Sequence, residues 1–308
     1  MTGSLHDHLD LVRAPAVLSV VGDTLAGAAA AGHALTPRRA LLPLASACLY
    51  AGGMALNDYA DRHLDAVERP ERPIPSGRVT ERRALQVAVG LTAAGVGLAA
   101  AGGGSRALAV AVPLAASVWT YDTVAKERAA GPLVMAACRG LDVLLGAGVG
   151  HLRAALPAAA GMAVHTAGVT YLSRGEVHGT TSSLAAGVAA ATAAGGAVVG
   201  AGAVRRARAA DGASHRTRVA TAVAGVAAAG AYLATCLPRQ VDAAITPSAQ
   251  NAFAATKAGI RAMLPLQAAW SARGGSLASV GVLAGVEVAG RLLRRAGRAP
   301  GRAEMSET

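Results

Sequence analysis

The chain is apolar and basic: of its 308 residues 53% are hydrophobic, 15% are charged and 3% are aromatic, with a formal net charge of +11. Soluble domains carry about 25% charged residues, so this composition excludes intrinsic disorder and argues against a soluble enzyme. A basic soluble protein suggests nucleic acid. A basic chain that is also this apolar instead predicts an integral membrane protein with arginine-rich loops and no nucleic-acid partner.

Residues 1–13 are predicted to be an N-terminal tail, and the first apolar stretch covers 14–31. The tail holds two aspartates, and no clear small-residue cleavage signal follows, so we expect a membrane span and not a signal peptide. Asp23 lies in this span ten residues after Arg13, about 15 Å deeper at 1.5 Å per residue. It is expected to bind a hydroxyl group of a substrate or to orient a partner side chain; the alternative is a hydrogen bond to a neighbouring helix.

A spanning helix needs roughly 20 mainly apolar residues. The sequence contains nine such stretches: 14–31, 40–56, 84–102, 106–121, 132–149, 154–172, 183–202, 217–236 and 275–292. The segment 250–270 carries two cationic residues and a proline, and we expect it to be re-entrant or interfacial. The predicted membrane domain is therefore 14–292, followed by a basic, disordered tail over 293–308.

Three longer loops carry most of the polar residues. They follow the second, fourth and sixth spans, at 57–83, 122–131 and 173–182, and by parity they emerge on the same membrane face. Six arginines in 57–83 place that face in the cytoplasm. Five arginines in 203–218 fall on the opposite face, so the charge evidence for the orientation is mixed.

The first of these loops begins with an acidic cluster. On a continuing helix Asp58, Asp61 and Asp65 lie at i, i+3 and i+7 and share one face, with Asn57 at its edge. Clustered carboxylates repel one another unless a cation neutralises them, and oxygen ligands of this kind suit Mg²⁺. The alternative is a solvated helix end whose aspartates pair with neighbouring arginines.

Glu71–Gly77 follows, with two prolines and a glycine that predict a rigid turn. Arg72 in this turn is able to present a bidentate fork to a phosphate. The alternative is an ordinary surface arginine.

The second loop begins with Tyr121 and Asp122, and Lys126 stands four residues after that aspartate. Asp122 and Lys126 therefore share a helix face, either as substrate contacts or as a mutual ion pair. Arg139 and Asp142 lie inside the fifth span. Charged residues within a span are functional candidates by default, although these two are also able to neutralise each other.

The third loop carries Arg174, Glu176 and His178. Glu176 is the single carboxylate of this loop, and His178 or Ser173 is able to help it bind a metal ion. His165, in the sixth span, is expected to be a packed, hydrogen-bonded core residue and not a catalyst.

Asn57-Asp58-x-x-Asp61-x-x-x-Asp65, followed by Arg72-Pro73-x-Pro75-Ser76-Gly77, resembles the UbiA superfamily of intramembrane prenyltransferases. The resemblance extends over most of the chain, because the spans and the loop parity also fit. It implies an all-α, multi-span transmembrane bundle of about nine helices around a central cavity. It also implies transfer of an isoprenyl group from a prenyl diphosphate to an acceptor, with Mg²⁺ held by two acidic motifs.

Residue chemistry and resemblance together assign the candidate site. The expected Mg²⁺ ligands are Asn57, Asp58, Asp61, Asp65 and Glu176. The residues expected to act directly in catalysis are Asp58, Asp61, Arg72 and Lys126. The expected substrate-binding residues are Arg72, Lys126, Tyr121, Asp122, Arg174, His178, Asp23, Arg139 and Asp142.

The third loop departs from the family pattern, which has two or more aspartates there; Leu172 stands where one is expected. The variant is similar to the EboC-like branch, which is found beside cyclitol-forming enzymes, and this favours a small polar acceptor, a cyclitol or other polyol or a phenol. Two other readings stay open. One is a terpene cyclase of the same fold, which needs no acceptor; the other is a transporter, disfavoured because the acidic cluster lies at one membrane face.

Overall fold

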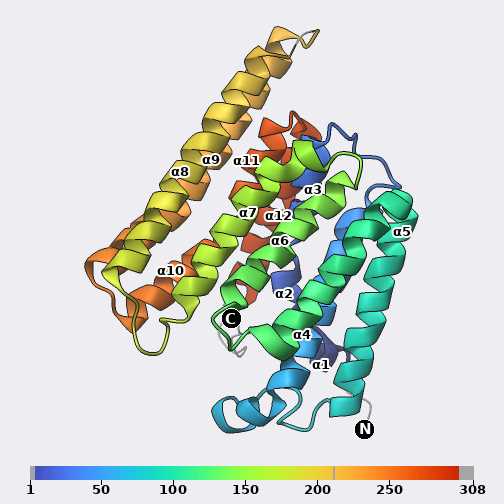
Figure 1. The fold of residues 1–308 in the computed structure, drawn as a ribbon, viewed down its shortest axis with the longest axis vertical. Coiled ribbons are helices and arrows are strands. Elements are labelled where there is room, and N and C mark those ends of the chain that lie inside the picture. Colours follow the sequence, from blue (N-terminus) through green and yellow to red (C-terminus); the bar gives the residue numbers. More distant parts are fainter. Residues whose placement is uncertain (1–3, 211, 298–308) are drawn as a thin grey trace.

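The computed structural model describes residues 4–210 and 212–297, which form helices joined by turns and contain no strand. Figure 1 shows these helices packed as one bundle. Their bounds are α1 Leu5–Leu11, α2 Ala14–Val17, α3 Val21–Ala30, α4 Leu41–Glu68, α5 Glu81–Thr120, a π-helix η1 at Tyr121–Ala125, α6 Gly131–Ala147, α7 Leu152–Ser173, α8 Ser182–Arg208, α9 His215–Ile245, α10 Ala249–Arg261, α11 Met263–Arg273 and α12 Leu277–Gly297. The all-α fold class is confirmed.

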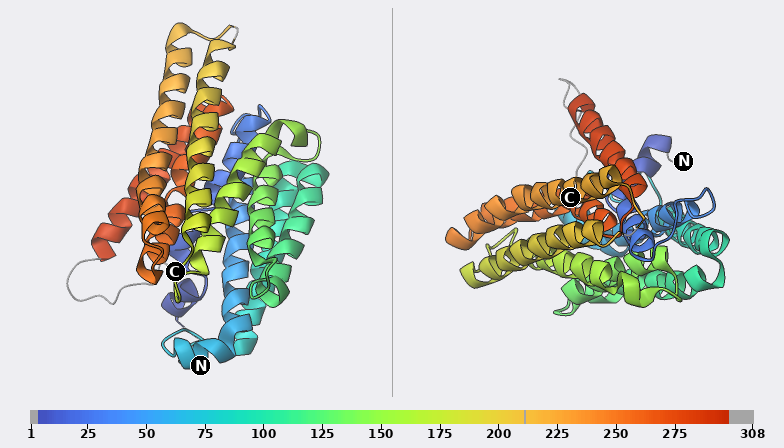
Figure 2. Two further views of the ribbon diagram at one scale, coloured as in Figure 1. Left: turned by 60° about the vertical axis from the view of Figure 1, so that its left-hand side comes forward. Right: turned by 90° about the horizontal axis from the view of Figure 1, so that it is seen from above.

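The polar loops gather at one end of the bundle, which we call the motif end. Successive long helices run antiparallel, so the connections 69–80, 126–130 and 174–181 lie at this end, low in Figure 1. The connections between α3 and α4, α6 and α7, and α11 and α12 lie at the opposite end, where the hairpin of α8 and α9 projects beyond the remaining helices (Figure 2). The turn between α9 and α10 returns to the motif end, where the Thr180 N–H donates to the Pro247 carbonyl at 3.1 Å. The two spans expected within 84–121 form α5, which folds back on itself at Gly104, where φ is 66°.

The first predicted span is broken and not continuous. The chain over 14–31 forms α2 and α3, separated by a turn at 18–20. Within this turn the carbonyl oxygen of Ser19 accepts hydrogen bonds from Gln267 Nε2 at 2.7 Å and Arg139 Nη1 at 3.4 Å. A broken helix at membrane depth requires such partners, because no water is available for the freed carbonyl.

The segment 250–270, predicted to be re-entrant or interfacial, runs along the bundle and does not turn back on itself. This segment forms α10 and α11, which meet at Ala262 and together run from the motif end to the opposite end in Figure 1. α10 packs against α7 and α9, and α11 packs against α3, α8 and α9. α12 then returns toward the motif end. The predicted disordered tail over 293–308 is wrong for 293–297, which continue α12, while 298–308 lie outside the described residues.

The N-terminal segment is a short helix and not a simple tail. A capping box begins α1, with the Ser4 hydroxyl and the Asp7 carboxylate each bonded to the other's backbone N–H. Arg78 Nη1 then bridges Asp7 and Asp10, at 2.9 Å from each carboxylate, and holds α1 against the 69–80 loop. The hydrogen bonds from Ser4 and Arg78 lower the pKa of Asp7 to about 2.

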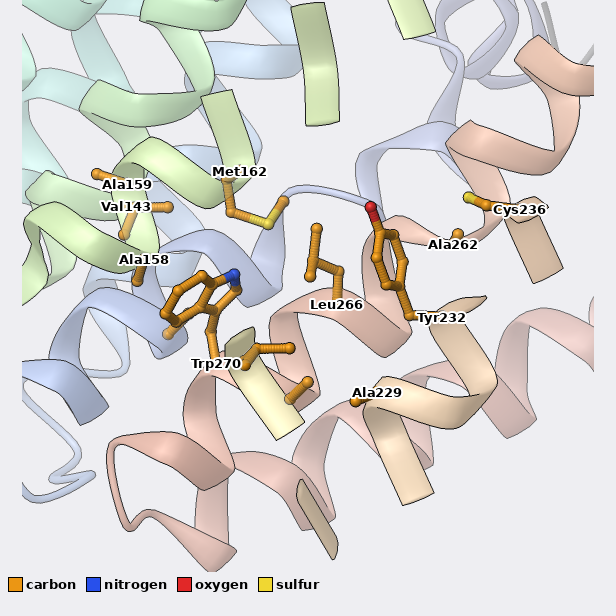
Figure 3. Packing of buried hydrophobic residues seen from close by; sticks show 13 residues of the cluster. Val143, Ala158, Ala159, Met162, Ala229, Tyr232, Cys236, Ala262, Leu266 and Trp270 are labelled. Atoms are coloured by element: carbon orange, nitrogen blue, oxygen red, sulfur yellow. The ribbon is translucent and has the colours of Figure 1, made fainter. Parts of the chain in front are cut away.

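Small and aromatic side chains form the core between α6, α7, α9 and α11 (Figure 3). Trp270 and Tyr232 are the large members, and alanines fill most of the remaining space. His165 is buried beside them and bonds through its two ring nitrogens to the Tyr232 hydroxyl at 3.1 Å and the Gly259 carbonyl at 3.0 Å. The expectation of a packed core histidine is confirmed.

Among the described residues, three helical stretches are long and apolar enough to cross a membrane: Glu81–Ala125, Ser182–Arg208 and His215–Ile245. Their most apolar windows are only 22%, 39% and 28% buried inside the protein. A helix that is apolar on its exposed side requires a nonpolar solvent. The outer surface of the bundle therefore matches the lipid environment that the composition predicts.

Candidate active site

Asp58 is the most deeply held carboxylate of the first motif. α4 continues past the apolar stretch to Glu68 and places Asp58 and Asp65, two turns apart, toward Arg72. Arg72 Nη1 lies 2.7 Å from Asp58 Oδ1 and 4.0 Å from Asp65 Oδ2. Arg13 Nη2 contacts the same Asp58 oxygen at 3.3 Å. Asp58 is 3% exposed, so these two guanidinium groups are what compensates its charge.

The turn after α4 has the non-helical geometry predicted for it. The Ser76 hydroxyl donates to the Arg72 carbonyl at 2.6 Å, and Gly77 adopts a φ of 74°, a conformation that favours glycine. The turn directs the guanidinium of Arg72 back toward α4, where it is 10% exposed. Arg72 is therefore part of the carboxylate cluster and not an ordinary surface arginine.

The second loop joins the first through a π-helix. The backbone N–H of Lys126 bonds to the Tyr121 carbonyl at 3.0 Å, five residues earlier, which widens the turn by one residue. The alternative of a mutual i, i+4 ion pair between Asp122 and Lys126 is not what the structure shows. Lys126 Nζ instead pairs with Asp61, and Asp122 accepts a hydrogen bond from Asn57 Nδ2 at 3.2 Å.

The third loop closes the motif end. Arg174 Nη2 donates to the backbone carbonyls of Arg128 and, at 3.3 Å, Lys126, and so ties the third loop to the second. Glu176 is half-buried, and this burial raises its pKa, which a hydrogen bond from Thr256 and the charge of Arg69 oppose.

His178 does not join the cluster. Its side chain is exposed, and no hydrogen bond connects it to the other site residues in the part of the chain that the structure describes. Its predicted role in substrate binding stays untested.

The donor atoms at the motif end suit a hard cation. The first two loops offer carboxylate and amide oxygens, from Asn57, Asp58, Asp61, Asp65 and Asp122, and these are the ligand types that Mg²⁺ prefers. Within the described residues no three carboxylate, histidine or cysteine side chains converge closely enough to hold a metal ion as they stand. The carboxylates are instead engaged by Arg13, Arg72 and Lys126.

A second polar cluster lies deeper in the bundle. Arg139 Nη1 contacts Asp23 Oδ2 at 2.6 Å, and Gln267 Nε2 donates to the other Asp23 oxygen at 2.8 Å. The Ser46 hydroxyl donates to Asp142 Oδ2 at 2.5 Å. The idea that Arg139 and Asp142 simply neutralise each other is wrong, because the guanidinium pairs with Asp23.

The two clusters are separate. Ser46 precedes Asp58 by twelve residues on α4, which is roughly 18 Å along the axis at 1.5 Å per residue. The structure therefore does not bring Asp23, Arg139 and Asp142 into the carboxylate cluster at the motif end.

Three residues of these clusters were not among the predicted site residues: Arg13, Ser46 and Gln267. Arg13 lies in the segment predicted to be a tail, and Ser46 is a single polar residue in an apolar span. Gln267 lies in the segment expected to be re-entrant. Burying a side-chain amide without a hydrogen-bond partner costs free energy. The presence of Gln267 in an apolar helix therefore indicates a buried polar partner, and this is how the sequence could have identified it.

Comparison with known proteins gives the family. The description "UbiA prenyltransferase family" matches residues 20–238. Digeranylgeranylglyceryl phosphate synthase of Methanopyrus kandleri is 50% identical over 80 residues, 26% of this chain and 28% of that protein. The synthase of the same name from Ignicoccus hospitalis is 44% identical over 94 residues, 30% and 31% of the two chains. The matched stretch thus spans less than a third of these relatives.

Solved structures show the same fold over nearly the whole chain. A UbiA homologue from Archaeoglobus fulgidus, solved with DMAPP and Mg²⁺, superposes with a TM-score of 0.56 at 16% identity, covering 90% of this chain and 99% of that one. A structure reported for digeranylgeranylglyceryl phosphate synthase has a TM-score of 0.57 at 15% identity, covering 88% and 98%. The chain therefore belongs to the UbiA prenyltransferase family of integral membrane proteins.

Proposed function

We propose that this protein is an Mg²⁺-dependent intramembrane prenyltransferase that moves an isoprenyl group from a prenyl diphosphate to a hydroxyl of a small polar acceptor. The observation that carries the proposal is the charge network at the motif end. It joins carboxylates Asp58, Asp61 and Asp65 to Arg72, in the same loop, and to Lys126, in the second loop.

Asn57, Asp58, Asp61, Asp65 and Glu176 are the residues that would hold Mg²⁺, which supplies positive charge for the departing diphosphate. Arg72 and Lys126 add fixed positive charge at the same place. Such preorganised groups stabilise charge that develops in a transition state.

In the proposed reaction the bond between C1 of the isoprenyl group and the diphosphate oxygen breaks, and the diphosphate leaves with the electron pair. A hydroxyl oxygen of the acceptor bonds to C1 and loses its proton. The intermediate carbon centre is strongly electrophilic, so water must be excluded. The apolar interior beside the motif end, with Leu56 and Ala125 buried there, is suited to that task. The central cavity expected for the isoprenyl chain stays a prediction.

The names of the relatives suggest which acceptor to test first. Two of them are named for digeranylgeranylglyceryl phosphate, a prenylated glyceryl phosphate. Their name favours a phosphorylated glycerol as the first acceptor to test, and it gives no support to a cyclitol or a phenol. The EboC-like assignment stays a prediction.

The test uses the purified full chain in nanodiscs with geranylgeranyl diphosphate, with and without Mg²⁺ and a glyceryl phosphate acceptor. We expect Mg²⁺-dependent diphosphate release and a prenylated acceptor in the mass spectrum. Asp58→Ala and Asp61→Ala are each expected to lower turnover on the order of 100-fold or more, since they remove groups that stabilise transition-state charge.

The matched control is Asp242→Ala, an exposed aspartate at the end of α9 that pairs with Arg239 at 3.4 Å, and it is expected to keep full activity. Undiminished turnover in both motif variants would refute the proposal. A cyclised hydrocarbon or alcohol formed without acceptor would instead identify a terpene cyclase. Vesicle uptake of a solute without any diphosphate would identify a transporter.

We also propose that the motif end faces the cytoplasm. The loop 57–83 holds six arginines, and α12 returns to the same end with three more near its C-terminus. The arginines of 203–218 at the opposite end weigh against this orientation. The orientation is tested by introducing a cysteine at exposed Glu71 and treating intact cells with a membrane-impermeant maleimide. If the motif end faces the cytoplasm, this cysteine is protected; labelling in intact cells would contradict the proposed orientation.

A further inference from the structure

A small cavity lies at the opposite end of the bundle, away from the carboxylates. Its volume is about 40 Å³, roughly three times what one water molecule needs. The loop after α3, the bend of α5 and the turn between α6 and α7 contribute its polar lining: His33, Arg39, Arg106 and His151. Leu42 on α4 also lines the cavity and precedes Asp58 by sixteen residues, so the two sites are roughly 24 Å apart along the helix.

The positive charge around this cavity has no acidic partner. No aspartate or glutamate occurs in 31–40, 101–107 or 146–155, and Arg39 and Arg106 make no salt bridge with any described residue. Arg39 Nη1 reaches only the Gly146 carbonyl, at 3.4 Å. Burial and the neighbouring Arg38 lower the pKa of Arg39. Arg39 is partly buried, and a partly desolvated cation is costly unless an anion accompanies it; the side chain of Arg106 is exposed.

The two histidines stand at the same cavity. The rings of His33 and His151 meet edge to face with centroids 4.6 Å apart, and His33 Nε2 lies 3.0 Å from the Ala147 carbonyl. Burial lowers the pKa of His33; the hydrogen bond to the Ala147 carbonyl opposes this shift, and the charge of Arg39 adds to it. His33 is therefore a neutral hydrogen-bonding group at the cavity near neutral pH, and the two arginines carry the positive charge there.

An apolar recess adjoins the cavity and shares His33 and Arg39 with it. Its other walls include Leu25, Leu35 and Pro43. The recess has a volume of only about 10 Å³, so a ligand whose anionic head of a few oxygens enters the cavity would lay an apolar remainder across these walls and not inside them.

We propose that this cavity binds the phosphate group of a phosphate ester, held by Arg39 and Arg106, with the apolar part of the molecule over the recess. Guanidinium forks match phosphate oxygens in geometry and in charge. Two sources offer this chemistry: the headgroup of an anionic phospholipid in the adjacent leaflet, and a soluble phosphate. The site is independent of the carboxylates, so it needs no part of the proposed reaction.

The experiment compares the full chain in nanodiscs that contain phosphatidylcholine with or without phosphatidylglycerol, and counts bound lipids by native mass spectrometry. A parallel arm titrates inorganic phosphate and follows ³¹P line broadening. The double variant Arg39→Gln with Arg106→Gln is expected to weaken binding of the preferred ligand at least tenfold. Arg153→Gln, an exposed arginine at the same end, is the matched control and should bind like the unaltered chain.

The outcomes are distinct. Preference for phosphatidylglycerol identifies the headgroup as the source, and binding of inorganic phosphate without lipid preference identifies a soluble ester. Absence of both in the unaltered chain overturns the proposal, as does equal binding by the double variant. If the double variant does not fold, Arg106→Lys keeps the charge and removes the fork, and it should weaken binding several-fold. Unchanged binding in Arg106→Lys would then count against the proposal.

Discussion

The crossing of α3 and α6 is predicted to tolerate no added methyl group. A Cβ on Gly146 would lie 1.9 Å from the Thr24 carbonyl oxygen, and one on Gly27 would lie 1.8 Å from the Val143 carbonyl oxygen. Ordinary contacts of this kind are 3.4–4 Å. Both obstacles are backbone atoms, so neither is able to rotate away. Gly146→Ala therefore has to push the helices apart.

The magnitude follows from two opposing effects. Overpacking of a core costs about 1–3 kcal/mol, and the rigid backbone walls place this case at the upper end. Alanine gains back up to about 1 kcal/mol over glycine inside a helix. We expect a net loss of about 2 kcal/mol, which is about 30-fold in the folded-to-unfolded ratio.

The assay is unfolding of the detergent-solubilised chain by increasing SDS fraction, followed by tryptophan fluorescence. Gly187→Ala on α8 is the matched control, because nothing lies within 4 Å of its added Cβ; it should be neutral or slightly stabilising. The reasoning is refuted if Gly146→Ala unfolds at the same SDS fraction as Gly187→Ala, or at a higher one. The crossing also aligns Asp23 with Arg139, so loss of their 2.6 Å contact should accompany the destabilisation.

Two further predictions concern ion pairs. Asp23→Ala leaves the guanidinium of Arg139 buried without its carboxylate, which typically costs about 3–5 kcal/mol of folding stability. In the same SDS titration, the double variant Asp23→Leu with Arg139→Met should recover most of this loss. If it recovers none, the loss does not have an electrostatic cause. The second follows from the pKa of Asp7, lowered from 3.8 to about 2. Its ionised form stabilises the folded state fully above pH 3.8, and this contribution is lost as the pH falls toward 2. Hydrogen-exchange protection of α1, corrected for intrinsic rates, should fall over that pH range. It should fall less in Arg78→Gln, which lacks the contact with Asp7. An equal pH dependence in the variant and the unaltered protein would rule out the Arg78 contact as a cause.

Local features of the sequence determined the class of molecule and the end of the bundle at which the candidate site residues gather. Composition and apolar stretches are set by the solvent that each residue must face, so they predict a helical membrane protein without any knowledge of packing. Loop parity follows from counting crossings up to the sixth span, and it correctly placed the loops of Asp58, Lys126 and Glu176 at one end. The turn at Arg72 was also predictable from local sequence, because proline fixes φ and glycine permits the positive φ that a turn needs.

Tertiary structure decided which acidic and basic side chains form ion pairs. Lys126 pairs with Asp61 and not Asp122 because the π-helix at 121–125 shifts its register, and periodicity rules assume a regular helix. The break in the first span and the crossing of 250–270 depend on partners such as Gln267 and Ser19, which are 248 residues apart. A polar group in an apolar segment indicates, from the sequence alone, that it needs a hydrogen-bonding or ionic partner. Only the packed bundle shows which one it has, because partners distant in sequence are brought together by packing and not by local propensity.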